Sequence, residues 1–216
     1  MSYLRDLHNF KSFLLDYKFE MLDVINIDGN LYCCGEPIMV DGKYIGEGKT
    51  WLNVTSSIQS THCKMLSNLY PYDIRFDGRK LGSLEGFFQG IKFKNPKVQK
   101  EVLKYFGINA LITKGASDYN WKETGIIYWK GKPIDRFSEE YDELTIRLYI
   151  SAIQNELYRS ALKTCHKKIV HIIGDENKKE SVFTREEFER MLNALREFLH
   201  EEDKKVYSFI RSTKKI

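Results

Sequence analysis

Apolar residues recur at helical spacing at the beginning of the chain and again through much of its second half. Leu4, Leu7, Phe10 and Leu14 lie three or four positions apart, which predicts an amphipathic helix over residues 3–22. The same periodicity predicts helices in four later segments. These segments are 84–93, 96–106, 139–164 and 184–199.

Two of the expected helices also have recognisable start signals. Asn95 precedes Pro96, and proline is favoured at the first position of a helix. Thr184 is followed three positions later by Glu187, which fits the capping-box pattern.

Residues 23–60 have a different pattern, in which short apolar runs are separated by turn residues. Asp28-Gly29 and Asp41-Gly42 each lie between two such runs, and Asp-Gly is a strong hairpin signal. Asp77-Gly78 marks a third hairpin, and residues 51–58 alternate as a strand. We therefore expect an α+β protein that is mainly helical and has a small N-terminal antiparallel β-sheet.

Composition indicates a globular protein and argues against several classes. The chain has 216 residues, of which 42% are apolar and 30% charged, and a net charge of +4. No apolar run approaches the roughly 18 residues of a membrane span, and the charged residues near the N-terminus are unlike a secretory signal. The four cysteines and five histidines lack metal-ligand spacing. We expect a cytoplasmic protein with reduced thiols, no cofactor and no membrane partner.

The segment that begins at Ser83 contains the clearest candidate chemistry. Ser83 is a plausible N-cap, and Glu85 follows in the first turn, where the helix dipole favours a negative charge. Glu85, Gln89 and Lys92 lie at i, i+4 and i+7 and so share one face of the expected helix. An acid and an amine held against apolar side chains are a common way to activate a nucleophile.

The same residues also have ordinary structural explanations that involve no catalysis. Glu85 and Lys92, seven positions apart on a helix, would ordinarily form a solvated face with little mutual interaction. Gly86 and Gly90 each cost about 1 kcal/mol against alanine inside a helix. Their presence indicates that something approaches that side closely, either a ligand or another stretch of backbone.

Three short motifs in this region occur in a fixed order. They are Ser67-Asn68-Leu69-Tyr70-Pro71, then Asp77-Gly78, then Ser83-x-Glu85-x-x-Phe88-Gln89-x-x-Lys92-Phe93. Together they resemble the hallmark of the NADAR family, named for its association with NAD and ADP-ribose. That hallmark is approximately S-N-F-x-P, D-G and S-x-E-x-x-(Y/F)-Q-x-x-K-F. A weaker similarity over residues 149–164 keeps Gln154-Asn155.

The resemblance implies a domain organisation. Residues 61–200 would form the NADAR-like (YbiA-like) domain, and residues 1–60, with the first helix and the hairpins, would extend it. Residues 201–216 would form a charged, frayed C-terminal tail. The glycine-containing segment 107–138 has no clear regular pattern, so we expect it to fold over the site as loops.

The resemblance also implies an activity. Members of the family are N-glycoside hydrolases, which cut the bond between a ribose C1 and a nitrogen in riboflavin precursors or ADP-ribosylated guanine. Lys92 would attack the ribose C1 and form a Schiff base, and Glu85 would be the acid/base. The substrate would be an ADP-ribosyl or ribosylamine conjugate of a nucleobase, free or within nucleic acid. The expected substrate-binding residues are Ser67, Asn68, Gln89, Trp129 and Asn155.

The residues themselves leave alternatives open. Trp129 and Trp121 lie in a polar segment, where a tryptophan ring can stack on a base or simply pack. Asp77, Asp118 and Asp135 are alternatives for a second carboxylate, although each is typical of a turn.

The late part of the family pattern is altered. The chain lacks the W-G-D-G and G-x-N-x-L-G segments that family members often have near their end. Two other functions therefore remain open: a non-catalytic ADP-ribose or nucleotide-binding module, or an interaction protein in a defence or toxin–antitoxin pair.

Overall fold

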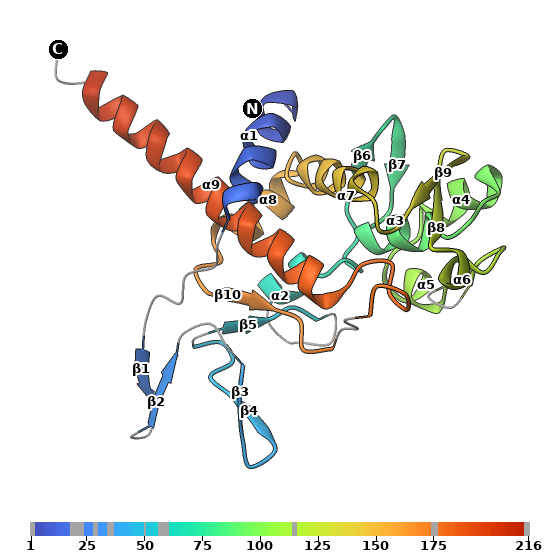
Figure 1. The fold of residues 1–216 in the computed structure, drawn as a ribbon. Coiled ribbons are helices and arrows are strands. Elements are labelled where there is room, and N and C mark those ends of the chain that lie inside the picture. The colour runs from blue at the N-terminus through green and yellow to red at the C-terminus, as the bar shows by residue number, and fades with distance from the viewer. Residues whose placement is uncertain are drawn as a thin grey trace.

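Helices predominate over short strands, which confirms the expected α+β class (Figure 1). The computed structural model of the chain describes residues 3–17, 24–27, 30–33, 37–49, 51–55, 61–113, 116–173 and 177–213. The helices are α1 (Tyr3–Asp16), α2 (Thr61–Leu66), α3 (Leu84–Gly90), α4 (Pro96–Val102), α5 (Gly107–Ile112), α6 (Trp121–Thr124), α7 (Glu139–Ala152), α8 (Glu156–Lys163) and α9 (Arg185–Thr213). The strands are β1 (Val24–Ile27), β2 (Asn30–Cys33), β3 (Ile38–Val40), β4 (Lys43–Ile45), β5 (Trp51–Asn53), β6 (Ile74–Phe76), β7 (Arg79–Leu81), β8 (Ile126–Trp129), β9 (Lys132–Asp135) and β10 (Lys168–Val170).

The described strands form separate two-stranded sheets. Four of them are antiparallel hairpins, β1–β2, β3–β4, β6–β7 and β8–β9, and the first two supply the small antiparallel sheets expected near the N-terminus. Strand β5 instead pairs in parallel with β10, with Trp51 opposite Lys168 and Asn53 opposite Val170. This pairing joins the N-terminal region to a strand near the end of the chain.

The hairpins predicted from Asp-Gly dipeptides are confirmed. Asp41 and Gly42 have φ of 48° and 74°, and Asp77 and Gly78 have φ of 47° and 76°. Two consecutive positive φ values are those that the tight hairpin turn requires. The remaining dipeptide, Asp28-Gly29, lies outside the described residues, although strands β1 and β2 flank it.

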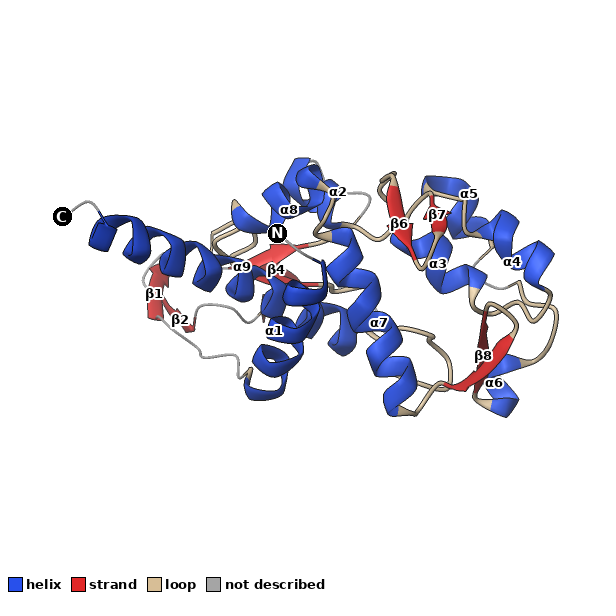
Figure 2. Ribbon diagram, turned by 90° about the horizontal axis from the view of Figure 1, so that it is seen from above, coloured by secondary structure: helices blue, strands red, loops and turns tan. Residues whose placement is uncertain are grey.

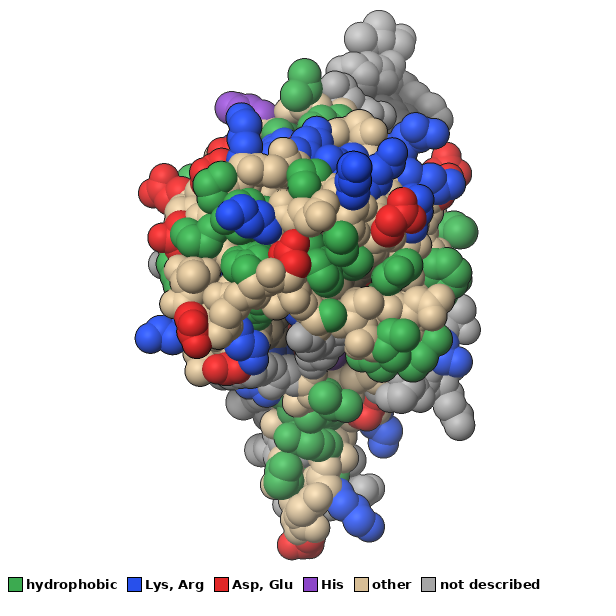
Figure 3. Space-filling view, turned by 90° about the vertical axis from the view of Figure 1, so that its right-hand side faces the viewer, with side chains coloured by type: hydrophobic (Ala, Val, Ile, Leu, Met, Phe, Trp, Pro, Cys, Tyr) green, Lys and Arg blue, Asp and Glu red, His purple; other side chains and the backbone are tan. Residues whose placement is uncertain are grey.

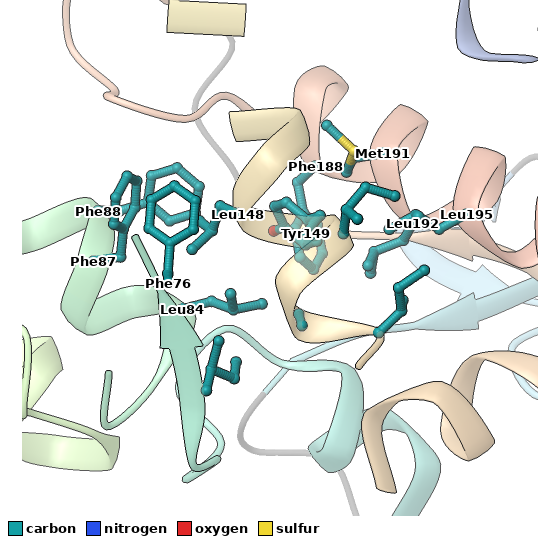
Figure 4. Packing of buried hydrophobic residues seen from close by; sticks show 14 of the residues in the cluster. Phe76, Leu84, Phe87, Phe88, Leu148, Tyr149, Phe188, Met191, Leu192 and Leu195 are labelled. Atoms are coloured by element: carbon teal, nitrogen blue, oxygen red, sulfur yellow. The ribbon is translucent and has the colours of Figure 1, made fainter. Parts of the chain in front are cut away.

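The hydrophobic core lies along α7, which has α3 and β6 on one side and α9 on the other (Figure 2). Figure 4 shows Tyr149 of α7 between Phe87 of α3 and Leu192 of α9, and all three are fully buried. Helix α1 packs on α7 and α9, where Phe10 meets Phe198 edge-on at 5.4 Å between ring centroids. The N-terminal helix therefore belongs to the same core as the later helices.

Several predicted helix boundaries were wrong. The segment 139–164 is divided into α7 and α8 because Asn155 caps α8: its Oδ1 accepts from the backbone N–H of Leu157 at 3.1 Å and of Tyr158 at 3.3 Å. Helix α9 continues to Thr213, so residues 201–213 are helical rather than a frayed tail.

Other boundaries differ less or agree. Helix α1 ends at Asp16, and residues 18–22, where the prediction continued, lie outside the described residues. The segment 107–138, expected to be irregular, contains α5, α6 and the β8–β9 hairpin. The capping box at α9 is confirmed, since Thr184 Oγ1 accepts from Glu187 N at 3.2 Å and Glu187 Oε2 accepts from Thr184 N at 2.7 Å.

Candidate functional site

A cavity of about 670 Å³ lies between α3, α6, the ends of β5 and β10, and the segment that leads into α9. A volume of this size suits a nucleotide-sized ligand, since small-molecule sites commonly measure about 300–1,000 Å³. Five of the seven residues selected from the sequence line it. They are Ser67, Asn68, Glu85, Gln89 and Lys92.

Helix α3 and the turn after it form the wall that contains three of these residues, and the start of the helix is fixed by Ser83. The Ser83 hydroxyl accepts from Gly86 N at 2.9 Å and donates to the Tyr105 carbonyl at 2.8 Å, so it caps the helix and ties it to the segment after α4. Gly86 and Gly90 pack against that same segment. A Cβ at Gly86 would lie 2.6 Å from the Tyr105 carbonyl oxygen, and one at Gly90 would lie 2.9 Å from a Leu103 methyl. Close packing therefore explains both glycines, against backbone at Gly86 and against the Leu103 side chain at Gly90.

Three side chains along the cavity wall form a hydrogen-bonded series. Gln89 Nε2 donates to Glu85 Oε1 at 2.5 Å, and Lys92 Nζ donates to Gln89 Oε1 at 2.5 Å. Lys92 is 5% exposed and Gln89 3%, while Glu85 is half-buried. Helix α3 ends at Gly90, so Lys92 lies in the turn after the helix rather than on it. The amide of Gln89 thus bridges the acid and the amine.

The turn that contains Lys92 is held by its neighbours. Tyr128 N of β8 donates to the Ile91 carbonyl at 2.8 Å. The buried side chain of Gln99 donates to the carbonyls of Gly90, Phe93 and Tyr128 and accepts from Lys130 N at 3.1 Å. No sequence motif contains Gln99, so it could not be selected from the sequence. Its role follows from the contacts that it makes between α4, the turn after α3 and the β8–β9 hairpin.

Asn68 is positioned by Tyr149 and by Glu85. The Tyr149 hydroxyl donates to Asn68 Oδ1 at 2.9 Å, and the Asn68 carbonyl accepts from Glu85 N at 2.7 Å. Burial, with the nearby Glu85 charge, raises the pKa of the Tyr149 hydroxyl well above its ordinary value, so it remains a neutral donor. Because Oδ1 is occupied in this way, the Asn68 amide nitrogen is the group available to a ligand.

Aromatic side chains form another part of the cavity wall. Phe88 stacks on Phe183 with ring centroids 4.5 Å apart, and the Trp121 ring centroid lies 5.8 Å from Lys92 Nζ. His171 also lines the cavity, and its Nδ1 lies 2.6 Å from the Val54 carbonyl oxygen. A carbonyl oxygen only accepts, so Nδ1 is the protonated nitrogen when this bond forms. Sequence reasoning missed His171 and Phe183 because neither lies in a motif.

The structure does not bring Trp129 or Asn155 to this cavity. Trp129 is 5% exposed and packs against Phe76 and Phe87, and its Nε1 donates to Asp77 Oδ2 at 3.0 Å. Asn155 is the N-cap of α8 and borders a separate shallow hollow. Trp129 Nε1 and Asn155 Oδ1 are therefore both bonded within the fold, away from the cavity.

The aspartates considered as a second carboxylate also have structural partners. Asp77 forms an ion pair with Arg147 at 2.9 Å. The Asp118 oxygens accept from two backbone N–H groups, and Asp135 Oδ1 accepts from Phe137 N at 2.8 Å. None of the three lines the cavity.

Comparison with known proteins places the chain in a family. Residues 61–197 match the family described as Bacteriophage protein GP30.3. The chain belongs to this family. The residues that match the GP30.3 family include α3, which forms one wall of the cavity. Val54 and Thr55, which also line the cavity, precede the matched residues.

A relative from Enterobacteria phage T4 is similar to this GP30.3 family member. It is the "Uncharacterized 17.1 kDa protein in Gp30-rIII intergenic region", 33% identical over 153 residues, which cover 68% of this chain and 98% of the relative. No solved structure matches. Neither match names the NADAR family, so that resemblance stays a prediction.

Among the described residues, no group of three or more His, Cys, Asp or Glu side chains is arranged to hold a metal ion. In the same part of the chain, no helix has both the length and the apolar character needed to cross a bilayer.

Proposed function

We propose that this protein is an N-glycoside hydrolase that removes ADP-ribose, or a ribosyl phosphate, from a nitrogen of a base or nucleotide. The observation that supports the proposal is the series Glu85–Gln89–Lys92 on the wall of a nucleotide-sized cavity. The NADAR resemblance assigns the acid/base and the nucleophile to the two ends of this series.

The reaction would use Lys92 as a nucleophile. An amine attacks only when it is unprotonated, and removal of water from a buried lysine disfavours the ammonium form. Lys92 is 5% exposed, on the wall of the cavity and beside the Trp121 ring. The attack forms a bond from Nζ to the ribose C1 and breaks the bond from C1 to the base nitrogen.

Glu85 would supply the proton that the departing nitrogen takes up, which is general-acid catalysis. The ribosylamine on Lys92 then loses a proton, and cleavage of the bond from C1 to the ring oxygen gives a Schiff base and a sugar hydroxyl. Water adds to the C1 of the Schiff base with Glu85 as the base. Release of the sugar restores the lysine amine and the carboxylic acid.

The remaining cavity groups suit a nucleoside ligand. The stacked rings of Phe88 and Phe183 offer an apolar surface beside a base, and the amide nitrogen of Asn68 offers a hydrogen-bond donor. Lys122 and Arg185 also line the cavity and would meet phosphate oxygens, although each already has a carboxylate near it.

The test is incubation of the protein with ADP-ribosylated guanine in mononucleotide and DNA form, and with riboflavin precursors, with and without borohydride. Mass spectrometry should detect released ADP-ribose or ribose phosphate and a reduced sugar adduct on the peptide that contains Lys92. Lys92→Met should remove both signals, and Glu85→Gln should slow release. Lys64→Met, the same change at an exposed lysine outside the cavity, should leave both unchanged.

Each other outcome is informative. Release without an adduct would retain the hydrolase but refute the Schiff base. Binding of ADP-ribose to both wild type and Lys92→Met without any release would overturn the hydrolase in favour of a non-catalytic binding module. Absence of both binding and release would overturn both functions.

A further inference from the structure

Six cationic side chains gather on the face formed by β7, α4 and the β8–β9 hairpin. Arg79 and Lys130 both lie over the Trp129 ring, at 5.7 Å and 5.9 Å from its centroid, and Lys94 Nζ lies 5.8 Å from the Tyr128 centroid. The start of α4 packs against the turn of the hairpin, since Pro96 lies 3.7 Å from where a Cβ on Gly131 would be. We call this group the basic face. It consists of Arg79, Lys94, Lys97, Lys100, Lys130 and Lys132.

Figure 3 looks onto this side of the molecule and shows Lys and Arg side chains gathered across its upper part. Lys97 and Lys100 are three positions apart on α4, whose buried residues are Gln99 and Val102, so both lysines are on its outer side. All six cations of the basic face are on or next to helix and strand, and a rigid backbone therefore fixes their spacing.

The cations of the basic face are not held in ion pairs with described residues. Within the described parts of the chain, none of its six cations forms an ion pair, whereas other lysines nearby do. Lys80 pairs with Asp73 at 3.1 Å and Lys104 with Glu101 at 2.8 Å. Asp77, the acid beside Lys130, is paired with Arg147. Asp73, Asp77 and Glu101 are thus already paired with cations outside the basic face.

The basic face begins next to the cavity. Lys94 follows Lys92 by two residues, and two residues of extended chain span about 7 Å at most. Asp118 fixes the backbone between Lys92 and α4 by accepting from Lys94 N at 2.7 Å and Asn95 N at 2.8 Å. A polyanion that follows the basic face would therefore pass close to the cavity wall.

We propose that the basic face binds the sugar–phosphate backbone of nucleic acid and so presents a modified base of the polymer to the cavity. Presentation of a base to the cavity rests on the proposed hydrolase function, whereas binding of nucleic acid to the basic face can be measured without any reaction. Cations spaced along rigid elements are typical of sequence-independent phosphate contact. The substrate of the cavity would then be a base within a strand rather than a free nucleotide.

The test measures binding of a fluorescein-labelled, unmodified DNA duplex by anisotropy at several salt concentrations. Each neutralised phosphate contributes a slope of about −0.9 to the plot of log affinity against log salt, so six contacts would give a slope of about −5 at most. The variant Lys97→Gln/Lys100→Gln should make this slope shallower by about 2. The control Lys204→Gln/Lys205→Gln removes the same charge from α9, where both lysines have glutamate partners, and should leave the slope unchanged.

Several outcomes would overturn the proposal. Equal weakening by both double variants would attribute binding to net charge alone. Binding to phosphatidylserine vesicles but not to DNA would assign the face to a lipid surface instead. The hydrolase is tested separately: Lys97→Gln/Lys100→Gln should leave release from a modified mononucleotide unchanged and raise KM for modified DNA. DNA binding without release from either substrate would refute the hydrolase and retain the basic face.

Discussion

The substitution Gln99→Leu tests whether one buried amide holds the turn that contains Lys92. Gln99 is fully buried, and its shortest contacts are the donation to the Tyr128 carbonyl at 2.8 Å and the acceptance from Lys130 N at 3.1 Å. Leucine would leave these two backbone groups without that partner. Each buried group left unsatisfied costs about 1–3 kcal/mol, and burial of leucine offsets part of the loss.

We therefore expect Gln99→Leu to lower the free energy of unfolding by about 2–4 kcal/mol, a large fraction of the 5–15 kcal/mol typical of a domain. Urea unfolding followed by tryptophan fluorescence should show a midpoint lower by about 1–2 M. Trp121 and Trp129 lie near the affected turn and will report its loosening.

The control for this prediction is Val98→Ala, which alters the neighbouring, exposed position of α4 and should change the free energy of unfolding by less than about 0.5 kcal/mol. A change for Gln99→Leu as small as that of the control would refute the argument that Gln99 fixes the turn. A destabilised variant with unchanged hydrolysis would separate its role in stability from any role in positioning Lys92.

Three further predictions concern the fold and the cavity. Gly86→Ala should lower the free energy of unfolding by about 1–2 kcal/mol. The new methyl would lie 2.6 Å from the Tyr105 carbonyl oxygen, and this overpacking outweighs the gain of about 1 kcal/mol in helix propensity. A raised thermal midpoint of unfolding would contradict this prediction. Burial alone would raise the pKa of Glu187, but the hydrogen bond from Arg136 is among those that hold it below its ordinary value. The stabilisation that ionised Glu187 gives to the folded state is therefore complete above the unfolded pKa of about 4.3, and it is lost as the pH falls through the lower folded pKa. Glu187→Gln should therefore flatten the dependence of the urea unfolding midpoint on pH in that acid range. Tyr149→Phe removes the hydroxyl bonded to Asn68 and should cost about 1 kcal/mol of stability and raise KM more than it lowers kcat, as measured with a modified mononucleotide.

The face of α3 could be predicted from sequence because its information is local. Ser83 caps the helix, and Glu85 and Gln89 are one turn apart, so spacing alone places them together. The end of the helix could not be predicted in the same way. The hairpin and Gln99 hold the backbone after Gly90 in a turn, and these are contacts with distant residues.

The opposite side of the cavity could not be predicted at all. Phe183 and His171 reach it only because α9 and β10 pack onto the earlier part of the chain, and no short motif contains either residue. Trp129 illustrates the converse error. All four residues of β8 are apolar, so the alternation that turns Ile127 and Trp129 inward is invisible in the sequence, while the surrounding polar residues suggest exposure.

The parallel pairing of β5 with β10 makes completion of the cavity a late event during folding. Val54 and His171 directly follow these two strands and both line the cavity, yet they are 117 residues apart in the sequence. Contacts at such separation require a long loop to close and form slowly compared with local helices. On the ribosome, α3 and Lys92 emerge well before β10, so the cavity is complete only after most of the chain has been synthesised. Ligand binding in this cavity would therefore report that the whole fold has assembled.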